Sequence, residues 1–385
     1  MKRPLKLIPY SHQSINQKDI EAVTRVLKSD FITQGPEVLE FENAVANYVG
    51  AKYAVAFNSG ASALVASCFA SGIGSGDEVI TTPYTFAASS NCFVWFGGIP
   101  KFVDIDFATL NINADRIEQA INKKTKAILA VDFAGNPCDW DRIKRIAKNY
   151  GLVTIDDAAH SIGSKYKGRM IGTIADITCF SFHPVKTITT GEGGMAVTND
   201  KKLWEKLLIF RNHGITRKNL QNNVGGWYYE MQELGLNFRL TDFQAALGVS
   251  QLSRIERFIG ARRLVVDVYR KAFSDLPIDV PKENNSSFAV WHLFTALLKL
   301  DEIKVSRKRI FDELKDRGLG VQVHYIPVHL QPYYRKKFGF KRGDFPISES
   351  VYESEISLPL FPDLSKKQID YVIKTFKDVI GEYSR

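Results

Sequence analysis

Cysteine is scarce in this sequence of 385 residues, and the four cysteines stand far apart, at Cys68, Cys92, Cys138 and Cys179. None of them belongs to a Cys-x-x-Cys pair. The sequence therefore indicates neither a zinc site nor a framework of disulfides, and the spacing fits a reducing compartment.

Long hydrophobic runs are also missing from the sequence. No stretch reaches the roughly eighteen apolar residues that a membrane-spanning helix needs. The charged residues of the N-terminus are not followed by the apolar segment of a signal peptide. We therefore expect a soluble, cytoplasmic protein with no membrane partner.

Recognisable nucleic-acid motifs, internal repeats and low-complexity tracts are absent as well. The formal net charge of +9 would suit a nucleic acid, an anionic surface or a small phosphorylated ligand. The densest basic cluster, at 335–337 with 341–342, is typical of a solvated face. We expect no nucleic-acid partner. The chain length predicts about two to three domains with ample core.

The most informative segment that is present runs from 180 to 195 and reads FSFHPVKTITTGEGGM. Its single lysine, Lys186, stands between an apolar strand-like run and a glycine-rich turn. A lysine can hold an aldehyde cofactor as a Schiff base and then carry a proton, if its surroundings lower its pKa. Glycines allow the backbone to pass close to such a cofactor. The alternative is a surface lysine followed by a turn.

Strand-like and helix-like segments alternate through the first part of the chain. We expect strands at 53–57, 78–81, 101–103, 127–131 and 152–155, and helices at 114–121 and 140–148. This alternation predicts an α/β fold with a mostly parallel central sheet and helices on both faces. Ligand-binding groups should gather where the strands end.

The remainder of the chain predicts a smaller C-terminal α/β domain. Strands are expected at 289–300 and 321–325, a helix at 306–314, and a final helix from Ser365 with Gln368 in the capping-box position. We place the large domain at 1–250 and the small domain at 251–385, joined by one long helix at about 241–274.

Several motifs occur together and in a characteristic order. Asp157 is followed three residues later by His160, then by Ser-Phe-His-x-x-Lys at 181–186 and Gly-Glu-Gly-Gly at 191–194. This series resembles the DegT/DnrJ/EryC1/StrS family, whose members are pyridoxal-phosphate aminotransferases acting on nucleotide-linked keto sugars. The resemblance implies a type I PLP-dependent transferase fold, like that of aspartate aminotransferase.

The resemblance also implies roles at the cofactor. Lys186 would be the catalytic residue that binds pyridoxal 5'-phosphate covalently, and the carboxylate of Asp157 would keep the pyridine nitrogen protonated. Residue type alone also allows simpler roles: a helix cap or salt bridge for the aspartate, and a satisfied, partly buried histidine for His160. The other expected cofactor residues are Gly60, Ala61, Ser62, Phe86, His160, Ser181 and Asn237.

Local sequence supports an anion site at 58–64, which the resemblance assigns to the cofactor phosphate. A strand, a turn of small residues and a helix N-terminus together form an anion site, although Ser59 could simply cap the helix. Many relatives have threonine at the position of Ala61, so only the backbone can serve there. Phe86 would stack on the cofactor ring or belong to the core. Asn237 would reach the cofactor phosphate of a second subunit, which implies a homodimer with shared active sites.

For the substrate, the resemblance implies a sugar nucleotide. The residues expected to contact it are Tyr10, Asp30, Phe31, Ile32, Thr33, Gly60, Ser181, Asn237, Gln322, Val323, His324 and Tyr325. The segment at 213–230, rich in asparagine, glycine and tyrosine, has the length of a functional loop that covers a substrate. For the aromatic segment around 322–334, packing at an interface is the alternative.

Segments at 228–235, 245–252, 322–334 and 356–360 resemble the branch of the family that acts in pseudaminic acid synthesis. That branch moves the amino group of L-glutamate, by way of pyridoxamine phosphate, to the 4-keto carbon of UDP-2-acetamido-2,6-dideoxy-β-L-arabino-hex-4-ulose, which corresponds to EC 2.6.1.92. The D-configured keto sugar of bacillosamine or legionaminic-type pathways is the main alternative. A non-enzymatic regulator or a basic binding module is the alternative from another class. Relatives that dehydrate sugars carry histidine in place of Lys186.

Overall fold

The structure is a computed structural model, and it describes residues 7–218, 220, 225–284 and 286–385. Its centre is a seven-stranded sheet in the order β1-β9-β8-β5-β4-β2-β3. The strands are β1 (Tyr53–Phe57), β2 (Glu78–Thr81), β3 (Ile99–Phe102), β4 (Thr125–Val131), β5 (Val153–Asp157), β8 (Ile177–Ser181) and β9 (Gly194–Thr198). Only β9 runs antiparallel to its neighbours in this sheet. The prediction of a mostly parallel sheet is confirmed.

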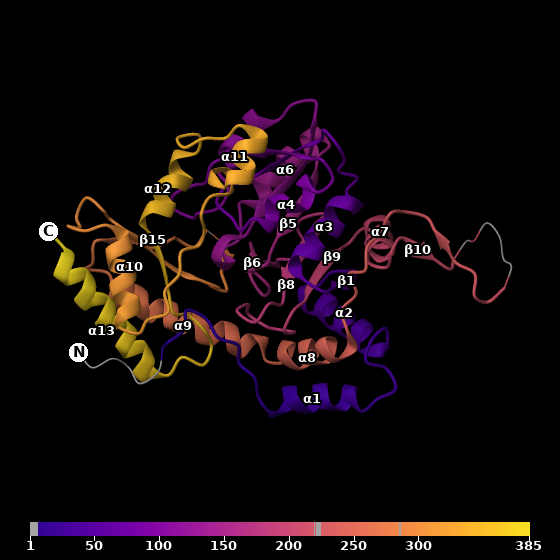
Figure 1. Cartoon of the computed structure of the whole chain (residues 1–385), viewed down its shortest axis with the longest axis horizontal. Coiled ribbons are helices and arrows are strands. Elements are labelled where there is room, and N and C mark those ends of the chain that lie inside the picture. The colour runs from indigo at the N-terminus through magenta and orange to yellow at the C-terminus, as the bar shows by residue number, and fades with distance from the viewer. Residues whose placement is uncertain (1–6, 219, 221–224, 285) are drawn as a thin grey trace.

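Helices cover both faces of this sheet (Figure 1). One face packs against α3 (Gly60–Ala70), α4 (Ala88–Val94) and α7 (Lys201–Arg211), and the other against α2 (Pro36–Val49), α6 (Trp140–Tyr150) and α8 (Asp242–Leu252). Successive strand residues point to opposite faces. In β1, Val55 and Phe57 accordingly join one core cluster, whereas Ala54 and Ala56 join the other.

A second, three-stranded antiparallel sheet lies in the C-terminal part of the chain, in the order β12-β14-β15. Its strands are β12 (Ile278–Asp279), β14 (Phe294–Leu298) and β15 (Glu355–Leu358). With α9 (Ile255–Ala272), α10 (Arg307–Asp316) and α13 (Lys366–Tyr383) it encloses a separate hydrophobic cluster. The expected capping box of Ser365 and Gln368 begins α13. The domain division at residue 250 stays a prediction.

Several predicted elements differ from the structure. The single helix expected at 241–274 is wrong, because α8 ends at Leu252 and α9 begins only at Ile255. The strand expected at 289–300 is shorter, since Trp291 has a φ of 48° and the regular strand begins at Phe294. No regular strand forms at 321–325, where Gln322 makes only an isolated bridge to Ser357. Tertiary contacts decide these boundaries.

Shorter elements complete the structure: α1 (Gln17–Leu27), α5 (Ala114–Ile117), α11 (Pro332–Phe338), α12 (Pro346–Ser354), η1 (Glu118–Ala120), η2 (Phe133–Gly135), η3 (Val328–Leu330), and the small sheet of β13 (Ser287–Phe288), β6 (Lys165–Tyr166) and β7 (Arg169–Met170). β10 (Ile215–Thr216) pairs with β11 (Glu230–Met231) in an arm, made of 213–218 and 225–236, that projects from the body (Figure 1). Within the described part of the chain, no helix has the length and hydropathy needed to cross a bilayer.

Helix α1 lies along α8 and is held there by one buried carboxylate. Asp19 accepts hydrogen bonds from Ser250 Oγ at 2.6 Å and Gln251 Nε2 at 2.9 Å, and it is paired with Arg254. It also closes the capping box with Asn16 at the start of α1. Helix α1 is thereby fixed to α8 through side chains.

Candidate active site

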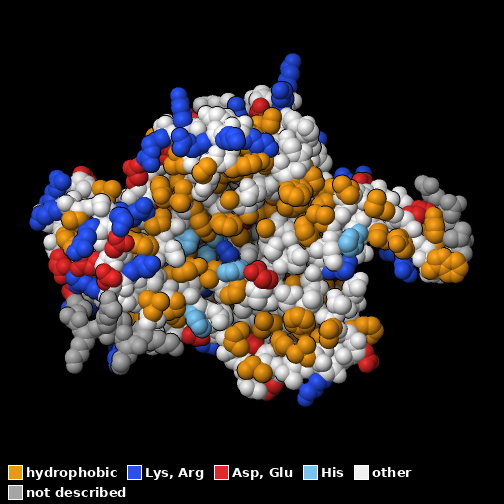
Figure 2. Space-filling model, in the orientation of Figure 1, with side chains coloured by type: hydrophobic (Ala, Val, Ile, Leu, Met, Phe, Trp, Pro, Cys, Tyr) orange, Lys and Arg blue, Asp and Glu red, His pale blue; other side chains and the backbone are white. Residues whose placement is uncertain are grey.

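A cavity of about 340 Å³ opens where the parallel strands of the large sheet end. Val131, Asp157 and Ser181, the last residues of β4, β5 and β8, all line it. This is the edge at which open α/β sheets bind ligands. Several histidines lie beside a hollow near the middle of the face shown in Figure 2.

Lys186 lies in this cavity, on the turn between β8 and β9. The turn is held by Lys186 N donating to His183 O at 2.9 Å and by Ser11 Oγ donating to Val185 O at 3.0 Å. Burial lowers the pKa of the Lys186 amine to about 8; the carboxylate of Asp157 opposes this shift and the guanidinium of Arg262 adds to it. The amine can therefore exchange a proton near neutral pH.

Asp157 faces the same cavity from the end of β5. Its Oδ2 accepts a hydrogen bond from Ser89 Oγ at 2.6 Å, and its Oδ1 accepts one from Ala159 N at 3.2 Å. Burial raises the pKa of this carboxyl, while both hydrogen bonds and the Lys186 cation favour its charged form. Its neighbour Asp156 points to the opposite face of β5, toward Thr178.

His160 stands at the side of the cavity with a defined tautomer. Its Nδ1 accepts a hydrogen bond from Ala134 N at 3.2 Å, so the ring proton resides on Nε2. That nitrogen lies 3.3 Å from the hydroxyl of Tyr325. Burial lowers the pKa of His160 well below its ordinary value, with the Lys186 cation adding to the effect. The ring is thus neutral and oriented.

The N-terminus of α3 meets the end of β8 at the floor of the cavity. Ser59 caps the helix by accepting from Ser62 N at 3.0 Å. The N–H groups of Gly60 and Ala61 have no acceptor in the described chain, as expected at a helix start. A Cβ on Gly60 would lie 2.8 Å from Ser181 Cβ, so only glycine permits this approach.

Other predicted residues lie around the cavity. The side chain of Phe86 is 61% exposed, although it lines the cavity, and its ring centroid is 5.8 Å from that of Tyr325. Tyr10 and His324 also line the cavity, with ring centroids 5.4 Å apart. Ser62 is buried behind Ser59 and does not line it.

The structure does not bring every predicted residue to the cavity. The residues Asp30, Phe31, Ile32, Thr33, Asn237, Gln322 and Val323 do not line it. All of these except Val323 are exposed and lie elsewhere on the chain. Thr33 pairs with Thr241, and Asn237 with Asn212, in isolated bridges. Their expected contacts with a ligand stay predictions.

Sequence reasoning missed several neighbours of the site. Ser89 contacts Asp157 across 68 positions of sequence, and no local pattern distinguishes it from its neighbour Ser90. Arg262, fully buried on α9, donates to the backbone carbonyls of Leu360 and His292 at 3.0 and 3.2 Å and lies 3.4 Å from that of Val185. His292 lies against His160, with ring centroids 4.3 Å apart. Only the folded chain brings these residues together.

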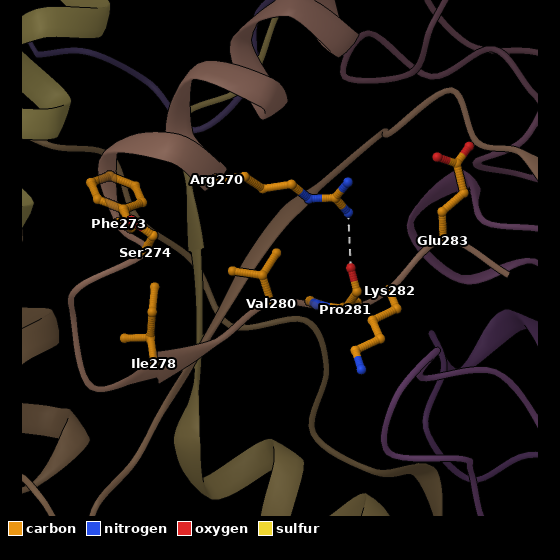
Figure 3. A pocket seen from close by; sticks show the side chains of 8 residues that line it. All are labelled: Arg270, Phe273, Ser274, Ile278, Val280, Pro281, Lys282 and Glu283. Atoms are coloured by element: carbon orange, nitrogen blue, oxygen red, sulfur yellow. Dashed lines mark hydrogen bonds between the residues drawn. The ribbon is translucent and has the colours of Figure 1, made fainter.

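A second hollow, of about 380 Å³, lies beside the end of α9 (Figure 3). Arg270 extends across it and donates to Pro281 O at 2.9 Å. Its one carboxylate, Glu283, is paired with Arg263 at 3.0 Å. Its lysine, Lys282, is exposed, so this hollow lacks a buried amine beside a carboxylate like the pair of Lys186 and Asp157.

The model of the DegT/DnrJ/EryC1/StrS aminotransferase family matches residues 13–377. The chain belongs to this family. Its sequence is 41% identical to the spore coat polysaccharide biosynthesis protein SpsC of Bacillus subtilis, over 97% of each chain. It is 38% identical to the UDP-4-amino-4,6-dideoxy-N-acetyl-beta-L-altrosamine transaminase of Campylobacter jejuni, over 98% of this chain and 99% of the relative.

Solved structures agree with this assignment. Helicobacter pylori PseC, an aminotransferase involved in the biosynthesis of pseudoaminic acid, superposes with a TM-score of 0.92 at 32% identity, over 98% of this chain and 100% of that chain. Other similar structures were solved in the PLP-form and the PMP-form. The type I fold and the dependence of this aminotransferase on pyridoxal phosphate are therefore confirmed.

Proposed function

We propose that this aminotransferase transfers the amino group of L-glutamate to the 4-keto carbon of UDP-2-acetamido-2,6-dideoxy-β-L-arabino-hex-4-ulose. The product is UDP-4-amino-4,6-dideoxy-N-acetyl-β-L-altrosamine. The observation that carries the proposal is the cavity in which Lys186 and Asp157 meet at the strand ends. The similarity to the Campylobacter jejuni transaminase supports the choice of substrate.

The residues of the cavity fit the cofactor. The free N–H groups of Gly60 and Ala61 at the start of α3 suit a phosphate. The missing Cβ at Gly60 lets Ser181 approach this helix start closely, so its hydroxyl lies beside the same N–H groups. Asp157, held by Ser89 and Ala159, suits a protonated ring nitrogen. The exposed ring of Phe86 suits stacking on a planar ring.

Pyridoxal phosphate, when bound, supplies an aldehyde carbon that bonds to amines and a conjugated ring that takes up electrons from the adjacent carbon. The chain supplies proton transfer and orientation. Lys186 Nζ removes and returns protons, and its lowered pKa keeps part of the amine unprotonated at neutral pH. A positioned base of this kind contributes about 10²–10⁴-fold to a rate. Phe86 and Tyr325 line one side of the cavity, with ring centroids 5.8 Å apart.

We also propose that the functional unit is a homodimer with shared active sites. The arm carries exposed hydrophobic side chains, including Trp227 and Leu234, which are 74% and 79% exposed. Further exposed apolar residues lie on α1 and α2, and Figure 2 shows hydrophobic side chains gathered on the arm and over α1. Asn237 lies outside its own cavity, which fits a role at the site of the partner. Exposed apolar surface of this extent is typical of an interface.

The substrate is tested with matched sugars. The loaded enzyme is treated with L-glutamate, desalted, and mixed separately with the L-configured and the D-configured UDP-4-keto sugars, and the amino sugar is measured by mass spectrometry. Product from the L sugar alone supports the proposal. Product from the D sugar alone would instead support a role in the bacillosamine or legionaminic-type branch. Product from neither sugar would refute both substrates.

The role of the lysine is tested separately. Lys186→Ala should bind the cofactor without a covalent link and show no turnover, whereas turnover in this variant would overturn the assignment. Lys186→Arg keeps the positive charge and serves as a control for charge alone. Membership of an aminotransferase family argues against the alternative of a basic binding module.

A further inference from the structure

A chain of three buried polar groups ends at the wall of the cavity. Ser357 Oγ lies 2.5 Å from Glu355 Oε1 and 2.8 Å from His324 Nδ1. His324 N donates to the second carboxyl oxygen, Glu355 Oε2, at 2.8 Å. Glu355 and Ser357 are two positions apart on β15, so both side chains point to the same side of the strand. Both are completely buried.

The histidine end of this hydrogen-bonded series reaches the cavity. The imidazole of His324 lines it, while its Nδ1 is occupied by Ser357. Its Nε2 has no hydrogen-bond partner among the described residues. This atom is also not among the fully buried polar atoms, so it is accessible from the cavity. This nitrogen is therefore open to a ligand in the cavity.

The protons on Glu355, Ser357 and His324 can be arranged in two ways. When Glu355 is charged it only accepts, so the hydroxyl of Ser357 donates to it, His324 carries its proton on Nδ1, and Nε2 offers a lone pair. When Glu355 is protonated it donates to Ser357, the serine donates to Nδ1, and His324 carries its proton on Nε2. His324 is neutral in both arrangements.

We propose that Glu355, acting through Ser357, sets the tautomer of His324 and so decides whether Nε2 donates a hydrogen bond to the substrate or accepts one from it. The proposal rests on the proposed function, in which this cavity holds the sugar nucleotide. Glu355 and Ser357 are then positioning residues, because neither lines the cavity.

The protons balance along this route. Loss of one proton from the cavity side of His324 Nε2 is accompanied by transfer of the Ser357 proton to Nδ1 and of the Glu355 proton to Ser357. The buried carboxyl thus exchanges its proton with the cavity through two neighbours. Burial raises the pKa of Glu355 to about 8, and burial lowers the pKa of His324 to about 4. Between these values the donor form of Nε2 predominates, which suits carbonyl or phosphate oxygens of a ligand.

The charged and titratable groups around the chain come from several elements. The guanidinium of Arg307 on α10 donates to the carbonyl oxygen of Glu355 at 3.2 Å and favours the charged carboxylate. The Lys186 cation disfavours a charged imidazole at His324. Tyr84 donates its hydroxyl to the carbonyl oxygen of His324, and the rings of Tyr10 and Tyr325 flank the imidazole. None of these contacts occupies Nε2.

The test is a titration of the full-length holoenzyme labelled with ¹⁵N-histidine, followed by NMR without any sugar. The His324 signals are identified by their loss in His324→Gln. In the wild type we expect Nε2 to change from the protonated to the unprotonated type with a midpoint near pH 8, while Nδ1 changes in the opposite direction. An unchanged tautomer across this range would overturn the proposal.

Variants separate the relay from a structural effect. In Glu355→Gln the amide oxygen can accept from His324 N while the amide nitrogen donates to Ser357, so Nε2 should stay protonated at every pH. Ser357→Ala should abolish the pH dependence, which also covers the case in which the glutamine variant does not fold. Glu353→Gln, an equal charge change at an exposed position two residues away, should titrate as the wild type. Wild-type titration in Ser357→Ala would overturn the proposal.

The pH dependence of KM provides a second test of the relay. KM for the sugar nucleotide should rise above pH 8 in the wild type and stay independent of pH in Glu355→Gln, with kcat little changed. A pH-dependent KM in Glu355→Gln would overturn the proposal. If neither UDP sugar is a substrate, the proposed function fails while the NMR titration still decides the relay.

Discussion

The lowered pKa of Lys186 leads to a quantitative prediction for the cofactor-free protein. Burial moves this pKa from 10.5 to about 8. At pH 7 an amine with the lowered value is about 9% unprotonated, against about 0.03% for an ordinary lysine, which is roughly a 300-fold difference. We therefore expect Lys186 to react with an amine reagent near neutral pH faster than an ordinary lysine in an exposed peptide does.

The assay is trace acetylation of the cofactor-free enzyme between pH 6 and 11, with peptide mapping by mass spectrometry. A short lysine-containing peptide in the same reaction provides the reference for an ordinary lysine. The labelling of Lys186 should reach half of its plateau near pH 8. A midpoint near that of the reference peptide would refute the argument from burial.

Two variants test the causes of the shift in opposite directions. Asp157→Asn removes the carboxylate that favours the charged amine, so the midpoint should fall. Arg262→Met removes the buried cation behind the lysine turn, so the midpoint should rise. Circular dichroism checks that each variant is folded. Shifts of the same sign in both variants would show that the local charges do not control the titration.

Three further predictions concern the framework of the site. Ser89→Ala should raise the pKa of Asp157 and weaken cofactor binding measured by equilibrium dialysis, and unchanged binding would contradict the role of this hydrogen bond. Gly194→Ala should lower the free energy of unfolding in urea by about 1–3 kcal/mol, because its Cβ would lie 2.4 Å from Ser59 O. Asp19→Ala should cost about 3–5 kcal/mol in the same assay, because it leaves a largely buried arginine unpaired. The exposed change Glu21→Ala is its control, and equal losses in the two variants would refute the argument.

Much of the fold was predictable because it depends on local pattern. Alternation of short apolar runs with amphipathic segments predicted the parallel sheet and its covering helices. Boundaries that depend on distant contacts were not predictable. The interruption at Trp291 is held by the hydrogen bond from His292 N to Ala134 O at 2.7 Å, and the break between α8 and α9 occurs within a sequence that continues the helical pattern.

The family follows from the sequence, and the same short motifs predict roles for Lys186 and Asp157, because the spacing of these motifs along the chain is characteristic. The sequence also indicated the helix start at 58–64, since a cap and small residues are local features. Folding is what brings Ser89 to Asp157, Arg262 to the lysine turn, and Glu355 and Ser357 to His324. Each of these contacts joins residues between 31 and 77 positions apart. Helix and strand periodicity relates only residues that are close in sequence, so it cannot predict these contacts. Hydrogen-bond direction and pKa depend on burial and on those neighbours, so the proton arrangement of the cavity follows from the fold and not from the motifs.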